Sequence, residues 1–284
     1  MDKFIVESPA KINLGLNVVR KREDGYHDLE TIFIPLLLSD KITFSKSNEF
    51  SFQTDSDLLN QLNDNLILKA IRLLEDFTDR KFVLDIFVEK VIPIGGGLGG
   101  GSSNAATTLK TINKMFNLGL DYTQLSSLAI ELGSDVPYFL NPVSSYAESR
   151  GELLYPLNID IPYPILIINP RITIDTAWAF KNIKPVTPVK NLRQIFQESL
   201  VDFDKLNSYV KNDFEEVVFN EFPLLKHIKE ELYNQGAEFA LMSGTGSTVY
   251  GIFSNLQKAH WAEEFFKQNY FTYLNNPFTK GSIT

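Results

Sequence analysis

The chain has 284 residues, of which 44% are hydrophobic and 22% charged, so we expect one large or two smaller domains with a packed core. The formal net charge is −8 and no long basic run occurs, which argues against a protein that binds nucleic acid by neutralising phosphates. The chain contains no cysteine and three histidines, which excludes disulfides, thiolate metal sites and cysteine nucleophiles and argues against a multi-histidine zinc site.

The first half of the chain alternates strand-like and helix-like segments. Strands are predicted over 3–6, 12–19, 31–38, 41–45, 49–53 and 82–91. Apolar residues recur at helical spacing over 64–77, which predicts a helix. A second helical stripe covers 105–116, and Ser102 or Ser103 could cap the helix that it predicts.

A third helix is predicted over 123–132, with Thr123 as its N-cap and Gly133 just beyond its end. The chain then becomes poor in charge, and three prolines fall within 156–164. We place the boundary between two domains in this stretch.

The predicted domains are 1–155 and 156–284, and both mix strands with helices, which indicates two α+β domains. In the second, an unbroken apolar strand over 165–169 is expected to be buried on both faces. Helices are predicted at about 175–182, 190–199, 203–210, 221–234 and 256–268. A strand is predicted over 248–253, and a last strand-like piece over 271–276 could pack back on the N-terminal domain.

The N-terminal segment starts with charged residues and has no apolar stretch long enough for a signal peptide. No run of 18 apolar residues occurs anywhere that would predict a transmembrane helix. We therefore expect a soluble cytoplasmic protein that makes no use of a membrane.

The most informative segment runs from Gly95 to Ser103, where six of the first seven residues are glycine. Glycine costs backbone entropy, so a cluster this dense indicates that the backbone approaches a ligand closely. The cluster lies between a strand-like and a helix-like run, which places it at a helix N-terminus. Free N–H groups and the helix dipole both favour an anion there, and phosphate is the expected anion.

Several patterns compete for this loop. A Walker A motif requires a lysine after the last glycine, and no lysine lies in the loop or directly after it. The Rossmann pattern G-x-G-x-x-G matches Gly95, Gly97 and Gly100, with Asp121 roughly 20 positions further on. A run of six glycines satisfies that pattern by density alone, however, and the loop does not follow the first strand. The remaining structural alternative is a tight or flexible turn that binds no ligand.

The remaining pattern is that of the GHMP kinases, the relatives of galactokinase, homoserine kinase, mevalonate kinase and phosphomevalonate kinase. Their loop is similar to P-x-x-x-G-L-G-x-S-S, and the segment 93–106 resembles it closely. The segment 8–14 resembles the first motif of the family, and 243–247 resembles its third, a second glycine loop. The three lie in the family's order, so the resemblance covers nearly the whole chain.

This resemblance implies a two-domain α+β kinase whose active site lies in the cleft between the domains. The segments 24–27 and 133–137 resemble those of family members that phosphorylate the 2-hydroxyl of a methylerythritol carrying a cytidine diphosphate, in non-mevalonate isoprenoid synthesis. The first alternative is a GHMP kinase that acts on another small-molecule substrate. A dinucleotide-binding oxidoreductase and a non-catalytic nucleotide sensor are the others.

The resemblance also assigns the ATP-binding residues. They are Pro93, Ile94, Gly95, Gly96, Gly97, Leu98, Gly99, Gly100, Gly101, Ser102, Ser103, Asn104, Asn65 and Thr245. Adenine contacts are expected from around Asn65 and near Lys90. Mg²⁺ is implied by the ATP chemistry; Ser102 and Ser103 could lie near it, but the sequence identifies no metal ligand.

Asp135 is the candidate base that accepts the proton of the acceptor hydroxyl, and it would therefore also contact the acceptor. The alternative interpretation of Asp135 is an aspartate that only stabilises a turn. Lys11 is the expected partner, because an ammonium beside Asp135 would keep the carboxylate ionised and stabilise developing negative charge. An ordinary surface lysine is the alternative for Lys11.

The other acceptor-binding residues come from separate parts of the chain. Asn13 follows Lys11 by two positions on one strand, so it faces the same side and could hydrogen-bond the substrate. Tyr26 would stack on the cytosine, and His27 would hydrogen-bond the edge of the pyrimidine. Phe180 is the expected opposite side of this stack, with Trp178 as a rival.

The second glycine loop completes the predicted site. Gly244, Thr245 and Gly246 would aim further backbone N–H groups and one hydroxyl at the phosphates. Gly244 is also assigned to the acceptor side of the site.

Overall fold

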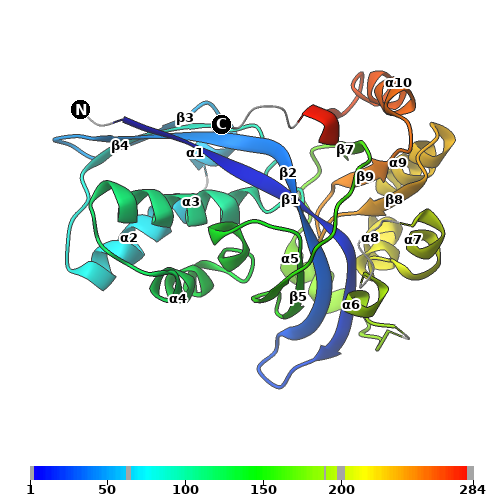
Figure 1. Ribbon diagram of the computed structural model, residues 1–284, viewed down its shortest axis with the longest axis horizontal. Coiled ribbons are helices and arrows are strands. Elements are labelled where there is room, and N and C mark those ends of the chain that lie inside the picture. The colour runs from blue at the N-terminus through cyan, green and yellow to red at the C-terminus, as the bar shows by residue number, and fades with distance from the viewer. Residues whose placement is uncertain (1–2, 62–64, 189, 197–201, 280–284) are drawn as a thin grey trace. The chain divides into compact units, whose positions relative to one another are not determined.

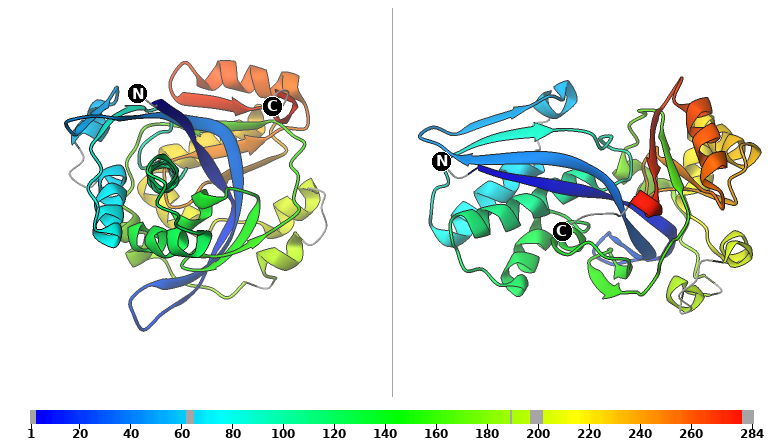
Figure 2. Two further views of the ribbon diagram at one scale, coloured as in Figure 1. Left: turned by 60° about the vertical axis from the view of Figure 1, so that its left-hand side comes forward. Right: turned by 45° about the horizontal axis from the view of Figure 1, so that its top comes forward.

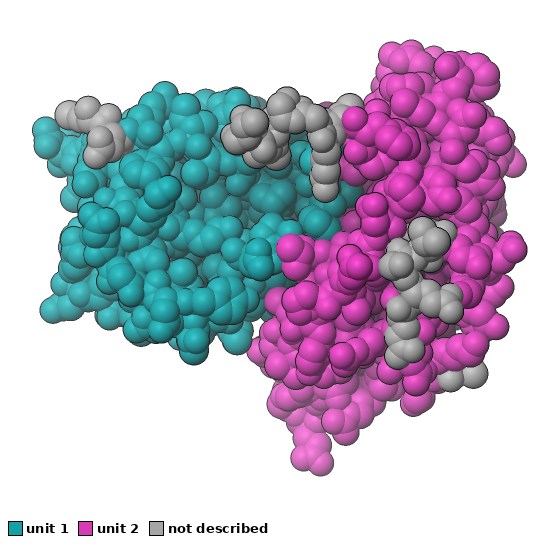
Figure 3. Space-filling model, in the orientation of Figure 1, with its two compact units in different colours: residues 1–11, 35–94, 99–142 teal, residues 12–34, 95–98, 143–284 magenta. Residues whose placement is uncertain are grey.

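The computed structural model describes residues 3–61, 65–188, 190–196 and 202–279. These residues form two compact units, each assembled from separate stretches of chain (Figure 3). Unit 1 consists of residues 1–11, 35–94 and 99–142, and unit 2 of residues 12–34, 95–98 and 143–284. The predicted domain boundary between 155 and 156 is a division along the sequence, and it stays a prediction.

Two long strands, β1 (Lys3–Lys21) and β2 (His27–Lys46), contribute residues to both units (Figure 1). The sequence predicted two shorter strands in place of each, which is wrong. Pro9 does not break β1, because among the described strands β1 pairs with β2 alone, and an edge strand tolerates proline. Pro35 lies in β2 between the segment that pairs with β5 and the segment that pairs with β4.

Unit 1 combines short strands with three larger helices. Its further elements are β3 (Ser51–Thr54), α1 (Asp57–Gln61), α2 (Leu66–Thr78), β4 (Leu84–Glu89), α3 (Gly100–Met115), α4 (Tyr122–Leu132) and the 3₁₀ helix η1 (Pro137–Leu140). The strand β4 pairs antiparallel with β2 and parallel with β3. The helices α2, α3 and α4 pack on one another on one face of these strands (Figure 1). α3 is the central helix, because most of its residues are buried.

Two predicted helix caps in unit 1 are wrong. α3 begins at Gly100 with Gly99 as N-cap, so neither Ser102 nor Ser103 caps it. The cap of α4 is Asp121, because its carboxylate accepts from the backbone N–H of Gln124 while the Gln124 side chain accepts from the backbone N–H of Asp121. In this reciprocal capping box, Asp121 and Gln124 each accept a hydrogen bond from the backbone of the other. Thr123 cannot be the N-cap, because it already lies inside the first turn of α4.

Unit 2 is built on a four-stranded antiparallel sheet with the order β10-β7-β9-β8. The strands and helices of this unit are β5 (Ser145–Ser149), β6 (Leu153–Pro156), β7 (Ile165–Asn169), α5 (Thr176–Asn182), α6 (Leu192–Ile195), α7 (Phe203–Tyr209), α8 (Phe214–Glu221), α9 (Pro223–Asn234), β8 (Phe239–Met242), β9 (Val249–Ile252), α10 (Leu256–Phe266), β10 (Phe271–Asn275) and η2 (Pro277–Thr279). All of β7 is buried, as its apolar run predicts. Leu166 and Ile168 share a core with residues of α9 and α10, which pack on this sheet.

The last strand is observed where the sequence predicts it and belongs to the sheet of unit 2. β10 pairs antiparallel with β7 along its whole length, and α10 lies beside it (Figure 2). The expectation that it also packs back on the N-terminal domain stays a prediction. The segment alternates weakly, so its partner could not be read from its own residues.

Some elements are missing from the sequence prediction. They are α1, β5, β6, α8 and β8, together with the 3₁₀ helices η1 and η2. The strands β5 and β6 are short, and their pairing with β2 and with each other decides their conformation. The predicted helix 190–199 is observed as α6 alone, and residues 197–199 lie outside the described part of the chain. None of the described helices combines the length and apolarity needed to cross a membrane, and the cytoplasmic location stays a prediction.

Candidate active site

The glycine loop has a backbone that other residues rarely adopt. Gly95, Gly97 and Gly99 have φ angles of 70°, 78° and 70°, in the left-handed region. Positive φ at alternate positions aims successive N–H groups toward one side, as in anion-binding nests. The loop ends at the start of α3, whose first N–H groups have no partner within the helix. The predicted anion site therefore has the backbone geometry that it needs.

The strand that enters this loop is fixed by a buried ion pair in unit 1. Asp40 is fully buried and its Oδ1 accepts from the backbone N–H groups of Val91 and Ile92, each at 2.8 Å. The Lys90 ammonium donates to Asp40 Oδ2 at 2.7 Å and to the Ile92 carbonyl at 2.5 Å. Burial lowers the pKa of Lys90, and Asp40 opposes that shift. Lys90 thus holds the chain just before the loop and uses its ammonium inside the protein.

Lys11 and Asp135 meet beside the N-terminus of α3. Lys11 Nζ lies 3.5 Å from Asp135 Oδ2, although β1 and the turn before η1 supply them from distant parts of the sequence. A Cβ added to Gly99 would lie 3.2 Å from Lys11 Cε, so the Lys11 stem passes directly by the helix start. Only 4% of the Lys11 side chain is exposed, against 36% for Asp135. Burial lowers the pKa of Lys11, and the Asp135 carboxylate opposes the shift.

Several predicted ATP-binding residues of unit 1 have structural partners. Ser8 Oγ lies 2.8 Å from Ser103 Oγ and 2.7 Å from Asn104 Oδ1, and all three side chains are buried. Ser102 directly precedes Ser103 in α3 and is half-buried. Asn65 caps α2, because its Oδ1 accepts from the Ile67 N–H at 2.9 Å. The sequence did not single out Ser8 as a partner of these residues, although Ser8 lies in the segment 8–14 that resembles the first motif of the family.

The remaining loop residues differ in exposure. Pro93 and Ile94 are half-buried, Leu98 is buried as part of the core, and Gly101 is exposed. A side chain at Gly101 would meet nothing closer than Leu66 Cδ1 at 3.6 Å. The exposed part of the loop is therefore glycine backbone, and Leu98 serves packing.

In unit 2 the segment 95–98 meets the second glycine loop backbone to backbone. A Cβ on Gly246 would collide with the backbone of Gly96 and Gly97, and a Cβ on Gly97 would collide with the Ser243 carbonyl. The Thr248 N–H donates to the Gly96 carbonyl at 3.2 Å. Two glycine-rich motifs that are far apart in sequence thus form one structure, which requires that neither carries a side chain at the contact.

Residues predicted on the acceptor side also lie at this loop. Asn13 is buried, and a Cβ on Gly244 would lie 3.4 Å from Asn13 Oδ1. Asn212, which the sequence missed, holds the loop through its Nδ2, which donates to the Met242 and Gly244 carbonyls at 2.8 Å each. Thr245 is half-buried, and its hydroxyl lies 3.1 Å from that of Thr176.

His27 and Phe180 are stacked, with ring centroids 5.2 Å apart and an interplanar angle of 29°. Phe180 also meets Phe214 edge-on. Burial and the charge of Lys21 lower the pKa of His27, so its imidazole is neutral at pH 7 and can both donate and accept one hydrogen bond. Trp178 packs edge-on against Phe222 instead, so Phe180 is the aromatic residue that accompanies His27.

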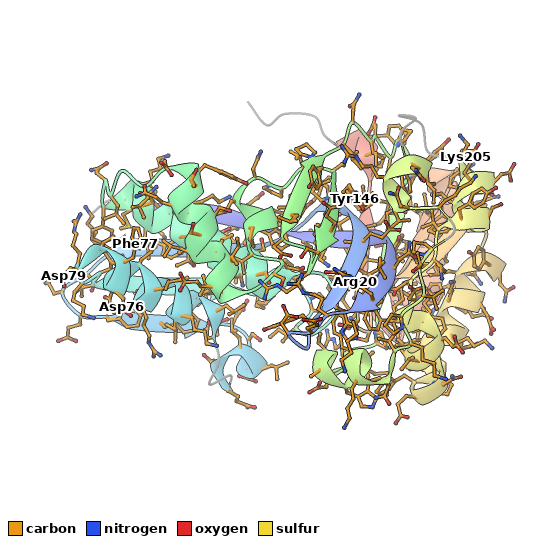
Figure 4. The ribbon with its side chains drawn as sticks, turned by 90° about the horizontal axis from the view of Figure 1, so that it is seen from below. Arg20, Asp76, Phe77, Asp79, Tyr146 and Lys205 are labelled. Carbon is orange, nitrogen blue, oxygen red and sulfur yellow. The ribbon has the colours of Figure 1, made fainter. Side chains whose placement is uncertain are left out.

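Tyr26 lies in the turn between β1 and β2 and is 54% exposed. The Arg150 guanidinium covers its ring at 4.8 Å from the centroid. Arg22 pairs with Asp24 and Asp28, which holds the turn that carries Tyr26. Figure 4 shows Arg20 on the same hairpin and Tyr146 on the neighbouring β5.

No group of three or more His, Asp or Glu side chains in the described part of the chain is arranged to hold a metal ion.

Comparison with protein families gives two matches. The model described as GHMP kinases N terminal domain matches residues 65–141, and the model described as GHMP kinases C terminal matches residues 190–271.

Individual proteins are similar over nearly the whole chain. A 4-diphosphocytidyl-2-C-methyl-D-erythritol kinase from Chlorobium phaeobacteroides strain BS1 is 38% identical over 98% of this chain and 99% of its own. A crystal structure of 4-(cytidine 5'-diphospho)-2C-methyl-D-erythritol kinase matches with a TM-score of 0.78 and 30% identity, over 95% of this chain and 98% of that one. A homoserine kinase from Cytophaga hutchinsonii has a TM-score of 0.71 at 16% identity, over 97% of this chain and 95% of its own, which shows a shared fold alone.

The contact between the two glycine loops predicts the effect of Gly246→Ala. The added Cβ must displace backbone of Gly96 or Gly97, so the free energy of unfolding should fall by about 1–3 kcal/mol, as for other overpacked sites. Denaturant titration without nucleotide measures this change. Gly101→Ala is the control, because its Cβ has room in a helix and should raise stability by up to about 1 kcal/mol. Equal stability of the two variants would contradict the prediction.

Proposed function

The chain belongs to the GHMP kinases and, among them, to the family of 4-diphosphocytidyl-2-C-methyl-D-erythritol kinases, and we propose that it phosphorylates the 2-hydroxyl of 4-diphosphocytidyl-2-C-methyl-D-erythritol. It is an ATP-dependent kinase that acts on a small molecule, so the products are ADP and the 2-phosphate of the acceptor. The reaction belongs to non-mevalonate isoprenoid synthesis. The observation that carries the proposal is the Lys11–Asp135 pair beside the glycine-capped start of α3.

Phosphoryl transfer requires alignment, neutralisation of charge and a place for the proton of the nucleophile. The first N–H groups of α3 and its dipole would bind the phosphates that carry the transferred group. The Lys11 ammonium, beside Gly99, would stabilise the negative charge that develops during transfer. Its burial supports this role, because a charge acts more strongly where water is excluded.

Asp135 would orient the acceptor hydroxyl and accept its proton. Its partial exposure supports this role, since a ligand can reach the carboxylate while Lys11 remains buried behind it. The Lys11 ammonium, 3.5 Å from the carboxylate, would also hold the Asp135 side chain in place for this contact.

The cytidine end of the acceptor would bind to unit 2. The exposed ring of Tyr26 offers a face for stacking, and the neutral imidazole of His27 can pair with the donor and acceptor groups of a pyrimidine edge. Phe180 holds the His27 ring by stacking on it. Asn13 and Gly244, which lie close together in unit 2, would also contact the acceptor.

Mg²⁺ would enter with the ATP phosphates. The Ser102 hydroxyl is the better of the two predicted neighbours, because the Ser103 hydroxyl is buried against Ser8. When bound, the ion would neutralise charge on the phosphates.

The acceptor is tested by ADP release from Mg-ATP with 4-diphosphocytidyl-2-C-methyl-D-erythritol, galactose, homoserine and mevalonate. We expect turnover with the cytidine compound alone. Turnover with another acceptor would retain the kinase and overturn the acceptor assignment. Nucleotide binding with no turnover on any of the four would favour a nucleotide sensor, and binding of NAD(H) without ADP release would favour an oxidoreductase.

Asp135→Asn should reduce kcat at least roughly 100-fold, because the amide cannot accept the proton. The fold should remain intact, which thermal unfolding checks. Asp121→Asn is the matched control, since asparagine is an equally good N-cap for α4 and Asp121 lies outside the proposed site. Near-normal turnover of Asp135→Asn would refute its role as base.

The pH dependence of turnover tests Lys11. Its ammonium is charged below its pKa, and burial lowers that pKa from the ordinary 10.5, so turnover should fall as pH rises through a value below 10.5. Lys11→Arg should turn over more slowly but lose this alkaline decline, since a guanidinium stays protonated. An unchanged alkaline decline in Lys11→Arg would assign it to another group.

A further inference from the structure

A buried row of polar groups in unit 2 joins the second glycine loop to the first. Its side chains are those of Thr31, Asn13 and Ser243, which are all buried, although 2% of the Asn13 surface remains exposed. Ser243 Oγ lies 3.2 Å from the Asn13 backbone N, 3.4 Å from Asn13 Oδ1 and 3.0 Å from the Gly97 carbonyl oxygen. The proposed function assigns Asn13 to the acceptor and Gly97 to ATP, but gives Ser243 no role.

The hydrogen bonds fix how the Asn13 amide is turned. Thr31 Oγ1 donates its one proton to the Gly15 carbonyl at 2.5 Å. It must therefore accept from Asn13, whose Nδ2 lies 2.9 Å away. The amide NH₂ of Asn13 thus faces Thr31, and its Oδ1 faces Ser243 and Gly244.

Ser243 has one proton and two acceptors for it. The hydroxyl accepts from the Asn13 N–H, and its proton is shared between the Gly97 carbonyl, at 3.0 Å, and Asn13 Oδ1, at 3.4 Å. A ligand hydroxyl that donates to Asn13 Oδ1 makes that oxygen a weaker acceptor for Ser243. The Ser243 proton then shifts further toward the Gly97 carbonyl.

The Gly97 carbonyl is tied to the phosphate loop by covalent geometry. The peptide unit is planar, so the direction of the Gly97 C=O also sets the direction of the Leu98 N–H. The preceding peptide is held in the same way, because Thr248 N–H donates to the Gly96 carbonyl. A stronger bond from Ser243 therefore fixes the direction of the Leu98 N–H, and Leu98 is one of the loop residues predicted to bind ATP.

We propose that Ser243 is a positioning residue whose hydroxyl couples the two substrates, so that the acceptor strengthens ATP binding and ATP strengthens acceptor binding. The inference rests on the proposed function for the assignment of Asn13 and Gly97. Coupling of this kind is reciprocal, since each ligand must change the affinity of the other by the same factor. One neutral hydrogen bond that is made more favourable corresponds to roughly a two- to tenfold change in affinity.

Calorimetric titration with a non-hydrolysable ATP analogue tests the coupling, with and without saturating 4-diphosphocytidyl-2-C-methyl-D-erythritol. In the unchanged protein, Kd for the analogue should fall roughly two- to tenfold when the acceptor is present. In Ser243→Ala this ratio should become one. Ser247→Ala is the matched control: Ser247 is equally buried in the same loop, but its hydroxyl donates to the Ile172 carbonyl at 2.6 Å, so the ratio should be retained.

Thr31 gives a second test if Ser243→Ala does not fold. Thr31→Val removes the group that orients Asn13 and should reduce the ratio, whereas Thr31→Ser keeps the hydroxyl and should retain it. A loss of one buried hydrogen bond without coupling would lower the melting temperature of these variants and leave the ratio unchanged, which would overturn the proposal. A ratio of one in the unchanged protein would also overturn it. Failure of the cytidine compound to bind at all would instead overturn the proposed function.

Discussion

The contact between two glycine-rich backbones constrains unit 2 more than any other interaction. Gly96 and Gly97 lie against Ser243 and Gly246 so closely that neither Gly97 nor Gly246 can carry a Cβ without moving backbone. Hydrogen bonds from Ser243 and Thr248 complete the contact. The sheet of this unit must therefore deliver the end of β8 to one position, and Asn212 serves that purpose by holding the carbonyls on either side of Ser243. A loop of flexible residues becomes rigid because it is packed, in spite of its composition.

Unit 1 meets a different requirement: it shields the Lys11 ammonium from water while it leaves the Asp135 carboxylate accessible. Lys11 is buried beside Gly99, and Asp135 faces it from a turn that remains partly open to solvent. Burial lowers the pKa of Lys11 and the Asp135 carboxylate opposes that shift, so the charge of the ammonium depends on Asp135. The Asp40–Lys90 pair holds the chain before the loop by the same principle, with both groups buried and fully used inside the protein. The two lysines thus have separate roles, since the ammonium of Lys90 is satisfied by Asp40 and the Ile92 carbonyl.

The proposed recognition of the acceptor relies on aromatic groups that differ in exposure. His27 is buried, stacked on Phe180 and neutral at pH 7, which suits an edge that must both donate and accept. Tyr26 is exposed and contacts Arg150, on a turn held by the ion pairs of Arg22. A buried histidine that can hydrogen-bond the edge of a base and an exposed tyrosine that can stack on its face together suit the binding of a nucleobase.

The sequence by itself determined the chemistry that the chain can offer: the glycine loop, a helix after it, the second glycine loop, and Lys11 and Asp135 as candidates for catalysis. It also determined the helices with strong apolar periodicity, such as 64–77, and the buried strand 165–169, because those patterns are local. Only the tertiary structure decided that Lys11 meets Asp135, that Gly97 meets Ser243, that Phe180 and not Trp178 stacks on His27, and that the last strand pairs with β7. Each of these depends on groups far apart in the chain, and their contact follows from packing and strand pairing, which no local pattern of residues encodes.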